Sequence, residues 1–223
     1  MPAANRATRR RNSARTKERI LRAGIALFAK HGPSATTIRM LAGRAGVNRR
    51  MLYYYFGSKE GLYRAAMRSM YEQNAIVETE LSRPGLSAEE LLDRFVRALY
   101  AFLSAHPEFV RLLTWENLRQ GRTVRHVDIG AVMEPVVEAL RVALDRGKSE
   151  GRFRRDIDEK QLLISCMSLS FFTFANRHTV SRAVGVDLAS SDAVERRVKH
   201  VVRLLLDGIR VHEDGRRPRR SRS

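Results

Sequence analysis

Residues 36–56 read TTIRMLAGRAGVNRRMLYYYF, and this stretch decides how the rest of the chain is interpreted. Two short segments with helical periodicity flank the tripeptide Ala45-Gly46-Val47. Glycine lets a chain turn sharply, and Thr37 and Asn48 are residue types that cap helix N-termini. Small side chains at Ala42 and beside the glycine allow two helices to cross closely. The stretch therefore predicts a helix-turn-helix.

The second predicted helix carries side chains that suit the major groove of DNA. A helix-turn-helix lays its second helix there, with the N-terminal residues facing base edges. Arg49 and Arg50 can each pair bidentately with guanine, and Asn48 can pair with adenine. Tyr53 and Tyr54 offer hydroxyls to phosphates and rings to thymine methyl groups. Because consecutive helical residues point in different directions, at least one of the neighbouring tyrosines is expected to be exposed.

Nearly every other segment also has helical periodicity, and about nine helices are expected. A first helix from about Ser13 to Lys30 is stopped by the Gly-Pro pair that follows it. Lys59 opens a fourth helix that runs to about Leu81, where its charge and the free N–H groups predict a phosphate site. Later helices are expected at about 88–105, opened by a Ser87/Glu90 capping box, and at 107–120, 131–149, 159–177 and 191–209. Period-2 strand patterns are absent, so the predicted fold class is all-α.

The formal charge of +18 is concentrated at the two ends of the chain. Residues 1–63 contribute +12, residues 213–223 contribute +3, and the remaining 149 residues contribute +3. A polyanionic partner is therefore expected, and nucleic acid is favoured over a membrane surface as that partner. The distribution indicates an anion-binding module joined to a domain of ordinary charge balance.

The N-terminal segment 1–12 is expected to be a disordered basic arm, because it has no large apolar side chain to anchor it to a core. Its arginines, Arg9, Arg10 and Arg11, either contact the minor groove and phosphates of DNA or remain a solvated terminus. The segment 213–223 is interpreted as a basic tail.

Several classes of protein are excluded at this point. The lone Cys166 cannot form an internal disulfide, so a secreted scaffold is not expected and a reducing cytoplasm fits. The longest run without charge, Gln161–Asn176, has 16 residues, whereas a membrane span needs roughly 20 apolar ones. The N-terminus lacks the apolar segment of a signal peptide, so the expected location is the cytoplasm, at the nucleoid. Motifs for catalysis, cofactors or metal ions are absent, so we expect no enzyme, no cofactor and no metal site.

Four spaced sequence elements carry a resemblance to a known family. They are TKERIL-x-A-xxx-LFA-x-HG from Thr16, ATTIR from Ala35, AGVN from Ala45 and LYYYFGSKEGL from Leu52. In order and spacing they resemble the DNA-binding domain of TetR-family transcriptional regulators, over about residues 14–70.

The resemblance implies an all-helical homodimer that binds a palindromic operator in double-stranded DNA. It implies a three-helix DNA-binding domain at 13–60 and a ligand-binding and dimerisation domain at 61–212, with the last two helices forming the dimer interface. The family's DNA contacts fall on Thr37, Asn48, Arg49, Tyr53, Tyr54 and Lys59. Arg50 stands where the family often has a small residue and Met51 where it often has Thr or Asn, so the operator sequence is not implied.

The resemblance further implies a repressor that a small-molecule effector of unknown identity releases from its operator. The alternative is an architectural or nonspecific nucleic-acid-binding protein that has no effector and depends on its basic arm and tail. Asn48 and Arg50 at base-reading positions speak against that alternative.

Candidate effector contacts are Trp115, Glu116 and Asn117. Glu116 shares one helical stripe with the apolar Phe109 and Leu112, so its carboxylate is expected to be buried and to need a partner. It either forms a structural pair with an arginine or lines an effector site with its two neighbours.

The segment from Gln161 to Ala175 is apolar around its whole circumference. A helix of this kind has to be covered on all sides, and a subunit interface supplies additional cover. We therefore expect this segment to form part of the dimer interface and of a pocket wall, with no membrane involved.

Overall fold

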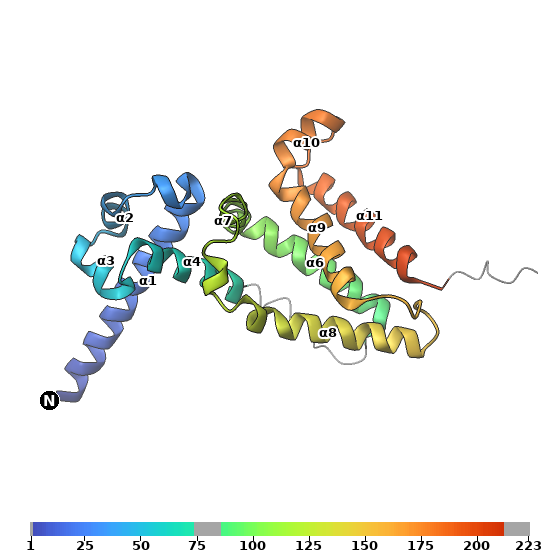
Figure 1. The fold of residues 1–223 in the computed structure, drawn as a ribbon, viewed down its shortest axis with the longest axis horizontal. Helices are drawn as coiled ribbons and strands as arrows, with labels where there is room; N and C mark the ends of the chain where they lie inside the picture. The colour runs from blue at the N-terminus through green and yellow to red at the C-terminus, as the bar shows by residue number, and fades with distance from the viewer. Residues whose placement is uncertain (1, 74–85, 212–223) are drawn as a thin grey trace, which may run out of the picture. The chain divides into compact units, whose positions relative to one another are not determined.

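The computed structural model describes residues 2–73 and 86–211, with side chains from residue 11 onward. Its described residues form ten α-helices and one 3₁₀ turn (Figure 1), which confirms the all-α prediction. An isolated antiparallel bridge joins Phe153 and Arg210. The elements are α1 (Pro2–Ala35), α2 (Ile38–Ala45), α3 (Arg49–Phe56), α4 (Lys59–Gln73), α6 (Ala88–Ala105), α7 (Pro107–Leu118), η1 (Val124–His126), α8 (Ile129–Ser149), α9 (Glu159–Ala175), α10 (Arg177–Val184) and α11 (Ser191–Ile209).

Side-chain caps set the helix starts at positions that the sequence indicates. At α2, Thr37 Oγ1 accepts a hydrogen bond from the Met40 N–H at 3.2 Å. At α6, Ser87 Oγ accepts from the Glu90 N–H at 3.2 Å, and Glu90 Oε2 accepts from the Ser87 N–H at 2.8 Å. This reciprocal pair confirms the predicted capping box, and α6 has the predicted bounds.

The first helix differs from its prediction at the N-terminal end. It begins at Pro2, so residues 2–12 continue α1 instead of forming a separate disordered arm. The physical reason is composition, because proline suits the first helical position and the alanines and arginines that follow are strong helix formers. The helix is interrupted at Gly32, whose φ of 75° and ψ of 160° are not helical, and this is the predicted stop.

Other differences concern the ends of later elements. The segment between the predicted helices 159–177 and 191–209 forms an additional helix, α10, and Gly185 ends it with a φ of 71°. The fourth helix is described to Gln73, and the predicted continuation to Leu81 lies outside the described residues. The predicted basic tail at 213–223 also lies outside them.

The chain divides into two compact units, residues 1–75 with 102–133 and residues 76–101 with 134–223. In the first unit, α1 packs against α2, α4 and α7. A Cβ at Gly24 would lie 3.1 Å from Leu62 Cγ, so glycine lets α1 and α4 approach closely. The core of this unit is formed by the fully buried Ile20, Phe28, Leu41, Leu52, Leu62 and Met67. The unit that holds the helix-turn-helix thus also contains α7, which the family resemblance places in the ligand-binding and dimerisation domain.

The second unit is built around α6, α9 and α11. One side of α11 is buried at Val198, Val201, Leu205 and Ile209. The Tyr100 hydroxyl of α6 donates to the Leu169 carbonyl of α9 at 3.1 Å. No helix among the described residues combines the length and the apolar character needed to cross a lipid bilayer.

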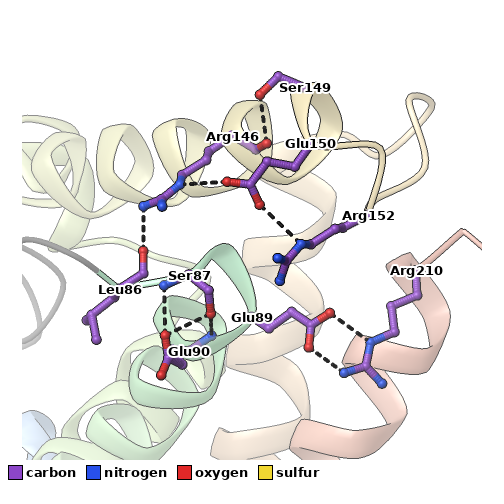
Figure 2. A network of polar contacts seen from close by, with 9 residues as sticks. All are labelled: Leu86, Ser87, Glu89, Glu90, Arg146, Ser149, Glu150, Arg152 and Arg210. Atoms are coloured by element: carbon purple, nitrogen blue, oxygen red, sulfur yellow. Dashed lines mark hydrogen bonds and ion pairs between the residues drawn. The ribbon is translucent and has the colours of Figure 1, made fainter.

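Polar contacts hold the end of α11 to the start of α6 in the second unit, as Figure 2 shows. The Arg210 guanidinium donates to both carboxylate oxygens of Glu89, at 2.5 and 3.1 Å. Arg146 of α8 donates to the Leu86 carbonyl at 2.5 Å and to Glu150 at 2.9 Å. The start of α6 is therefore fixed by arginines that lie about 60 and 120 positions away in the sequence.

Candidate nucleic-acid interface

The predicted helix-turn-helix is present as α2, a turn at Gly46-Val47, and α3. Gly46 has φ 61° and ψ 42°, the left-handed conformation that glycine adopts without strain. The Val47 N–H donates to the Ala42 carbonyl at 3.1 Å and closes the end of α2. The glycine at position 46 therefore accounts for the turn, because this backbone conformation requires no contact from another side chain.

A side chain from α1 holds this turn in place. Arg19 Nη2 donates to the Ala45 carbonyl and, at 2.9 Å, to the Gly46 carbonyl. Sequence reasoning missed this role, because Arg19 occupies an ordinary exposed position of a charged helix. No local signal distinguishes it from its neighbours.

The two sides of α3 have opposite character. Leu52 is fully buried, whereas Tyr53 is 50% exposed and Tyr54 is 77% exposed. Arg49 and Arg50 are exposed at the first turn and make no hydrogen bond or ion pair with described residues. The predicted exposure of at least one tyrosine is confirmed. The exposed side of α3 thus presents two free guanidinium groups and two phenols to any partner.

Tyr55 takes a different place from the two tyrosines before it. Its side chain is half-buried, and its hydroxyl lies 3.0 Å from Ser13 Oγ of α1. Its ring packs edge-on against Tyr54 with the centroids 5.0 Å apart. Tyr55 therefore links α3 to α1 and supports the orientation of Tyr54.

Thr37 and Asn48 act as N-caps and are exposed. Asn48 Oδ1 accepts from the Met51 N–H at 3.0 Å, as Thr37 Oγ1 accepts from the Met40 N–H at the start of α2. Capping uses one acceptor atom of each side chain, so the Asn48 amide N–H₂ and the Thr37 hydroxyl proton stay available as donors. Donors at helix N-termini are suited to phosphate oxygens.

Lys59 lies at the start of α4 and is half-buried. Its Nζ donates to the Thr36 carbonyl at 3.1 Å, which ties α4 to the residue before the N-cap of α2. An ammonium has three N–H donors, so this contact leaves two for a phosphate. The structure thus adds a structural role to the phosphate role that the sequence predicts for Lys59.

The surface formed by α1 to α3 carries many positive charges and few negative ones. The chain has no acidic residue between Glu18 and Glu60. Arg11 of the predicted arm is exposed, and the side chains of Arg9 and Arg10 lie outside those described. In the described part of α1 to α3, the exposed arginines are Arg11, Arg15, Arg19, Arg22, Arg39, Arg44, Arg49 and Arg50. Such a surface attracts a polyanion.

Comparison with known proteins decides the family. Residues 20–66 match the family profile described as bacterial regulatory proteins, tetR family. Residues 89–205 match the profile described as tetracyclin repressor-like, C-terminal domain. The chain belongs to the TetR family. It is a DNA-binding regulator of transcription with a helix-turn-helix at its N-terminus.

Individual relatives agree with this assignment. This TetR-family chain is 34% identical over 197 residues to the HTH-type transcriptional repressor NicS of Pseudomonas putida. The matched region covers 88% of this chain and 93% of NicS. It is 24% identical over 192 residues to the HTH-type transcriptional repressor SCO4008 of Streptomyces coelicolor, covering 86% and 95%. Its fold is similar to a tetR-family regulatory protein from Rhodococcus RHA1, with a TM-score of 0.69, 20% identity, and coverage of 89% and 98%.

The three candidate effector contacts of this TetR-family chain do not meet at one place. Glu116 is 1% exposed and accepts from the backbone N–H groups of Thr123 and Val124, the latter at 3.0 Å. Its other oxygen lies 3.7 Å from Arg119. The observed contacts are therefore those of the structural arginine pair, one of the two alternatives that the sequence leaves open.

Trp115 and Asn117 lie on different sides of α7 from each other. Trp115 Nε1 donates to the Ala29 carbonyl of α1 at 3.4 Å, and its ring packs against Gly32, where an added Cβ would meet it at 3.0 Å. Asn117 is exposed. Trp115 thus joins α7 to the end of α1 within the first unit.

Proposed function

We propose that this regulator is a homodimeric repressor whose α3 helices read the two halves of a palindromic operator. The observation that supports this proposal is that α3 has a buried side and an exposed side. Leu52 is buried, whereas the unpaired Arg49 and Arg50 are exposed. Tyr53 and Tyr54 are exposed as well. Guanidinium groups at the first turn of a helix in the major groove can pair with guanine O6 and N7. These four residues would therefore supply base contacts.

Phosphate contacts are proposed for the residues at helix starts. Thr37 and Asn48 keep free donors after capping, and Lys59 keeps two N–H donors after its contact with Thr36. Such contacts position the recognition helix and contribute affinity for any sequence. For Arg9, Arg10 and Arg11 we propose added phosphate contacts, supported by their place on the N-terminal turns of α1.

The dimer interface is proposed on α9 and α11, which correspond to the last two helices predicted from the sequence. Ile164, Met167 and Phe172 of α9 are 54, 40 and 52% exposed, and Leu204 of α11 is 50% exposed. Large apolar side chains that gather on exposed helices are typical of a protein interface. A second copy of the chain would cover them and place two copies of α3 about one helical turn of DNA apart.

Repression and release are proposed from the relatives, because NicS and SCO4008 are both described as transcriptional repressors. A small-molecule effector would favour a conformer whose two recognition helices no longer match the half-site spacing. Operator affinity would then fall, and the regulated genes would be expressed. We further propose a cytoplasmic location at the nucleoid, where the operator lies.

The test is to select fragments of the source genome with the purified full-length protein and to sequence them. A shared palindrome is expected, with half-sites about one helical turn apart. The double variant R49A/R50A should lose the enrichment, whereas R152A, which changes an exposed arginine of the second unit, should keep it. Recovery of fragments without a common sequence would instead support a nonspecific nucleic-acid-binding protein.

A further inference from the structure

A basic cavity of about 240 Å³ lies within the first unit. The end of α1, the first turns of α4 and the turn between α7 and η1 form its walls. Three basic residues, Lys59, Arg119 and Arg122, line it against a single acidic residue, Glu60. A second cavity of about 240 Å³ shares four lining residues with it and adds further arginines. The walls come from three separate parts of the chain, so the site exists only in the folded unit.

Much of the positive charge here is not neutralised by the protein. The Arg122 guanidinium is exposed and makes no hydrogen bond or ion pair with described residues. Arg119 pairs with the buried Glu116 at 3.7 Å and lies over the Tyr63 ring, 5.3 Å from its centroid. Arg64, in the wall of the second cavity, also has no partner among the described residues. Arginines in this state attract carboxylates and phosphates.

A buried donor lines the same cavity. Tyr63 is 2% exposed, and its hydroxyl lies beside the Glu116 carboxylate and the Arg119 guanidinium. Burial, together with the nearby Glu116 carboxylate, raises the pKa of this hydroxyl, so it keeps its proton at neutral pH. The Glu116 carboxylate can accept from this hydroxyl, so the basic side chains Lys59, Arg119 and Arg122 are what the cavity offers to a ligand.

The volume limits the size of a ligand. The space is about eight times the roughly 30 Å³ that one water occupies in the liquid. Pockets for drug-sized ligands span about 300–1,000 Å³, so this cavity suits a compact molecule. Thr123 and Ser34 add hydroxyl groups that can bond to its remaining polar atoms.

We propose that this cavity binds a small organic oxyanion, a carboxylate or a phosphate monoester, through Lys59, Arg119 and Arg122. The same lysine donates to the carbonyl of Thr36, the residue before the N-cap of α2. An anion draws the ammonium toward the cavity and cancels charge that α4 would offer to DNA. Anion binding therefore weakens DNA binding, and this coupling, unlike the anion site itself, rests on the proposed role of Lys59.

Trp115 provides a direct readout of the site. It is the single tryptophan of the chain, and its ring packs against Gly32, next to Pro33 in the cavity wall. The full-length protein is titrated with sodium phosphate and, separately, with sodium succinate, while sodium chloride keeps the ionic strength constant. We expect a saturable change in tryptophan emission with at least one of the two anions.

Arg122→Gln is the test variant, and Arg111→Gln is its matched control. Both replace an exposed arginine of the first unit that has no partner among the described residues, but only Arg122 lines the cavity. Loss of one charge-assisted contact should raise the dissociation constant about tenfold in the Arg122 variant and leave the control unchanged. Circular dichroism confirms that both variants are folded. A non-saturating signal with both anions, or equal affinities in the two variants, overturns the proposal.

A second measurement separates a free anion from DNA phosphates as the ligand. The selected genomic DNA is titrated with each protein, with and without the anion that gave saturation. The anion should weaken DNA binding by the wild type and the Arg111 variant, and not by the Arg122 variant. If Arg122→Gln weakens DNA binding without any anion, the cluster contacts DNA and the proposal is wrong. The fluorescence titration contains no DNA, so its outcome does not depend on whether a palindrome is found.

Discussion

Arg19 of α1 donates from Nη2 to the carbonyl oxygen of Gly46, 27 positions along the chain, at 2.9 Å. The same guanidinium bonds to the Ala45 carbonyl, so one side chain holds both oxygens at the turn of the helix-turn-helix. The angle between α2 and α3 is therefore fixed partly from outside the motif. Hydrogen bonds from a charged donor are among the stronger polar contacts in proteins.

The first prediction concerns this contact. Arg19→Ala should weaken operator binding by about tenfold, because the turn loses a charged donor worth about 1.5–3 kcal/mol. Arg22→Ala is the matched control, since Arg22 lies on the same helix and pairs only at 3.7 Å with the exposed Glu18. Fluorescence anisotropy with labelled operator DNA measures both. Equal losses in the two variants would show that charge alone matters.

The second prediction separates base contacts from phosphate contacts. Arg50→Ala should reduce the preference for operator over unrelated DNA, by about 1–3 kcal/mol for a lost bidentate pair. Lys59→Ala should weaken binding to both DNAs alike and lower the slope of log affinity against log salt by about one. Titrations at several salt concentrations provide both quantities. Identical behaviour of the two variants would contradict these assigned roles.

The third prediction contrasts the two sides of α3. Leu52→Ala should lower the free energy of unfolding by about 2–5 kcal/mol, because Leu52 is fully buried. Tyr54→Ala should change it by no more than about 0.5 kcal/mol, because that side chain is 77% exposed. The Tyr54 variant should nevertheless lose operator affinity. Urea unfolding followed by circular dichroism tests stability, and a large effect of Tyr54→Ala would place that ring in the core.

The fourth prediction concerns pH. The hydrogen bonds from Arg210 hold the pKa of Glu89 below its ordinary value of 4.5. A carboxylate with a depressed pKa in the folded state stabilises the fold above its unfolded pKa and loses this effect as the pH falls through the folded pKa. Glu89→Gln should thus cost up to about 1 kcal/mol at pH 7, for this partly exposed pair.

The same difference should shrink as the solution is acidified below about pH 4.5, since the wild-type carboxylate then becomes neutral as well. Glu138→Gln provides a control, because its pair with Arg141 joins residues of one helix and closes no distant contact. Thermal unfolding at several pH values measures the effect. A difference between wild type and Glu89→Gln that stays constant down to pH 3 would rule out this linkage.

The fifth prediction tests the proposed dimer interface. Phe172→Glu should raise the dimer dissociation constant at least about tenfold, because it places a charge in an apolar interface. Val142→Glu on α8 makes the same kind of change at a side chain that is 56% exposed, outside the proposed interface. Sedimentation velocity distinguishes monomer from dimer. A Phe172 variant that remains as dimeric as the control would remove α9 from the interface.

Much of the fold could be predicted because its signals are local. The N-caps at Thr37 and Asn48 bond to backbone groups three residues away, and Ser87 and Glu90 cap each other over the same distance. The predicted first helix starts too late because residues 2–12 have no large apolar side chain to anchor them, although their alanines and arginines favour a helix without one.

The candidate site was predictable only in part. The exposed side of α3 followed from helical periodicity, since Leu52 and Tyr54 must point in different directions. For Glu116, periodicity predicted burial, but its bonds to the Thr123 and Val124 backbone depend on how the chain turns after α7. Gly121 marks the end of the helix, but the residues themselves do not show which side chain the following turn will bond to.

The amino-acid sequence by itself determined the helices, the turn at Gly46 and the residues that α3 exposes. These follow from caps, glycine and side-chain periodicity, which act within about four residues. Only the tertiary structure decided that Arg19 holds the turn, that Lys59 bonds to Thr36, and that arginines from α4 and from the segment after α7 share a cavity. Those contacts join residues that are far apart in the chain, so they exist only once the helices have packed against one another.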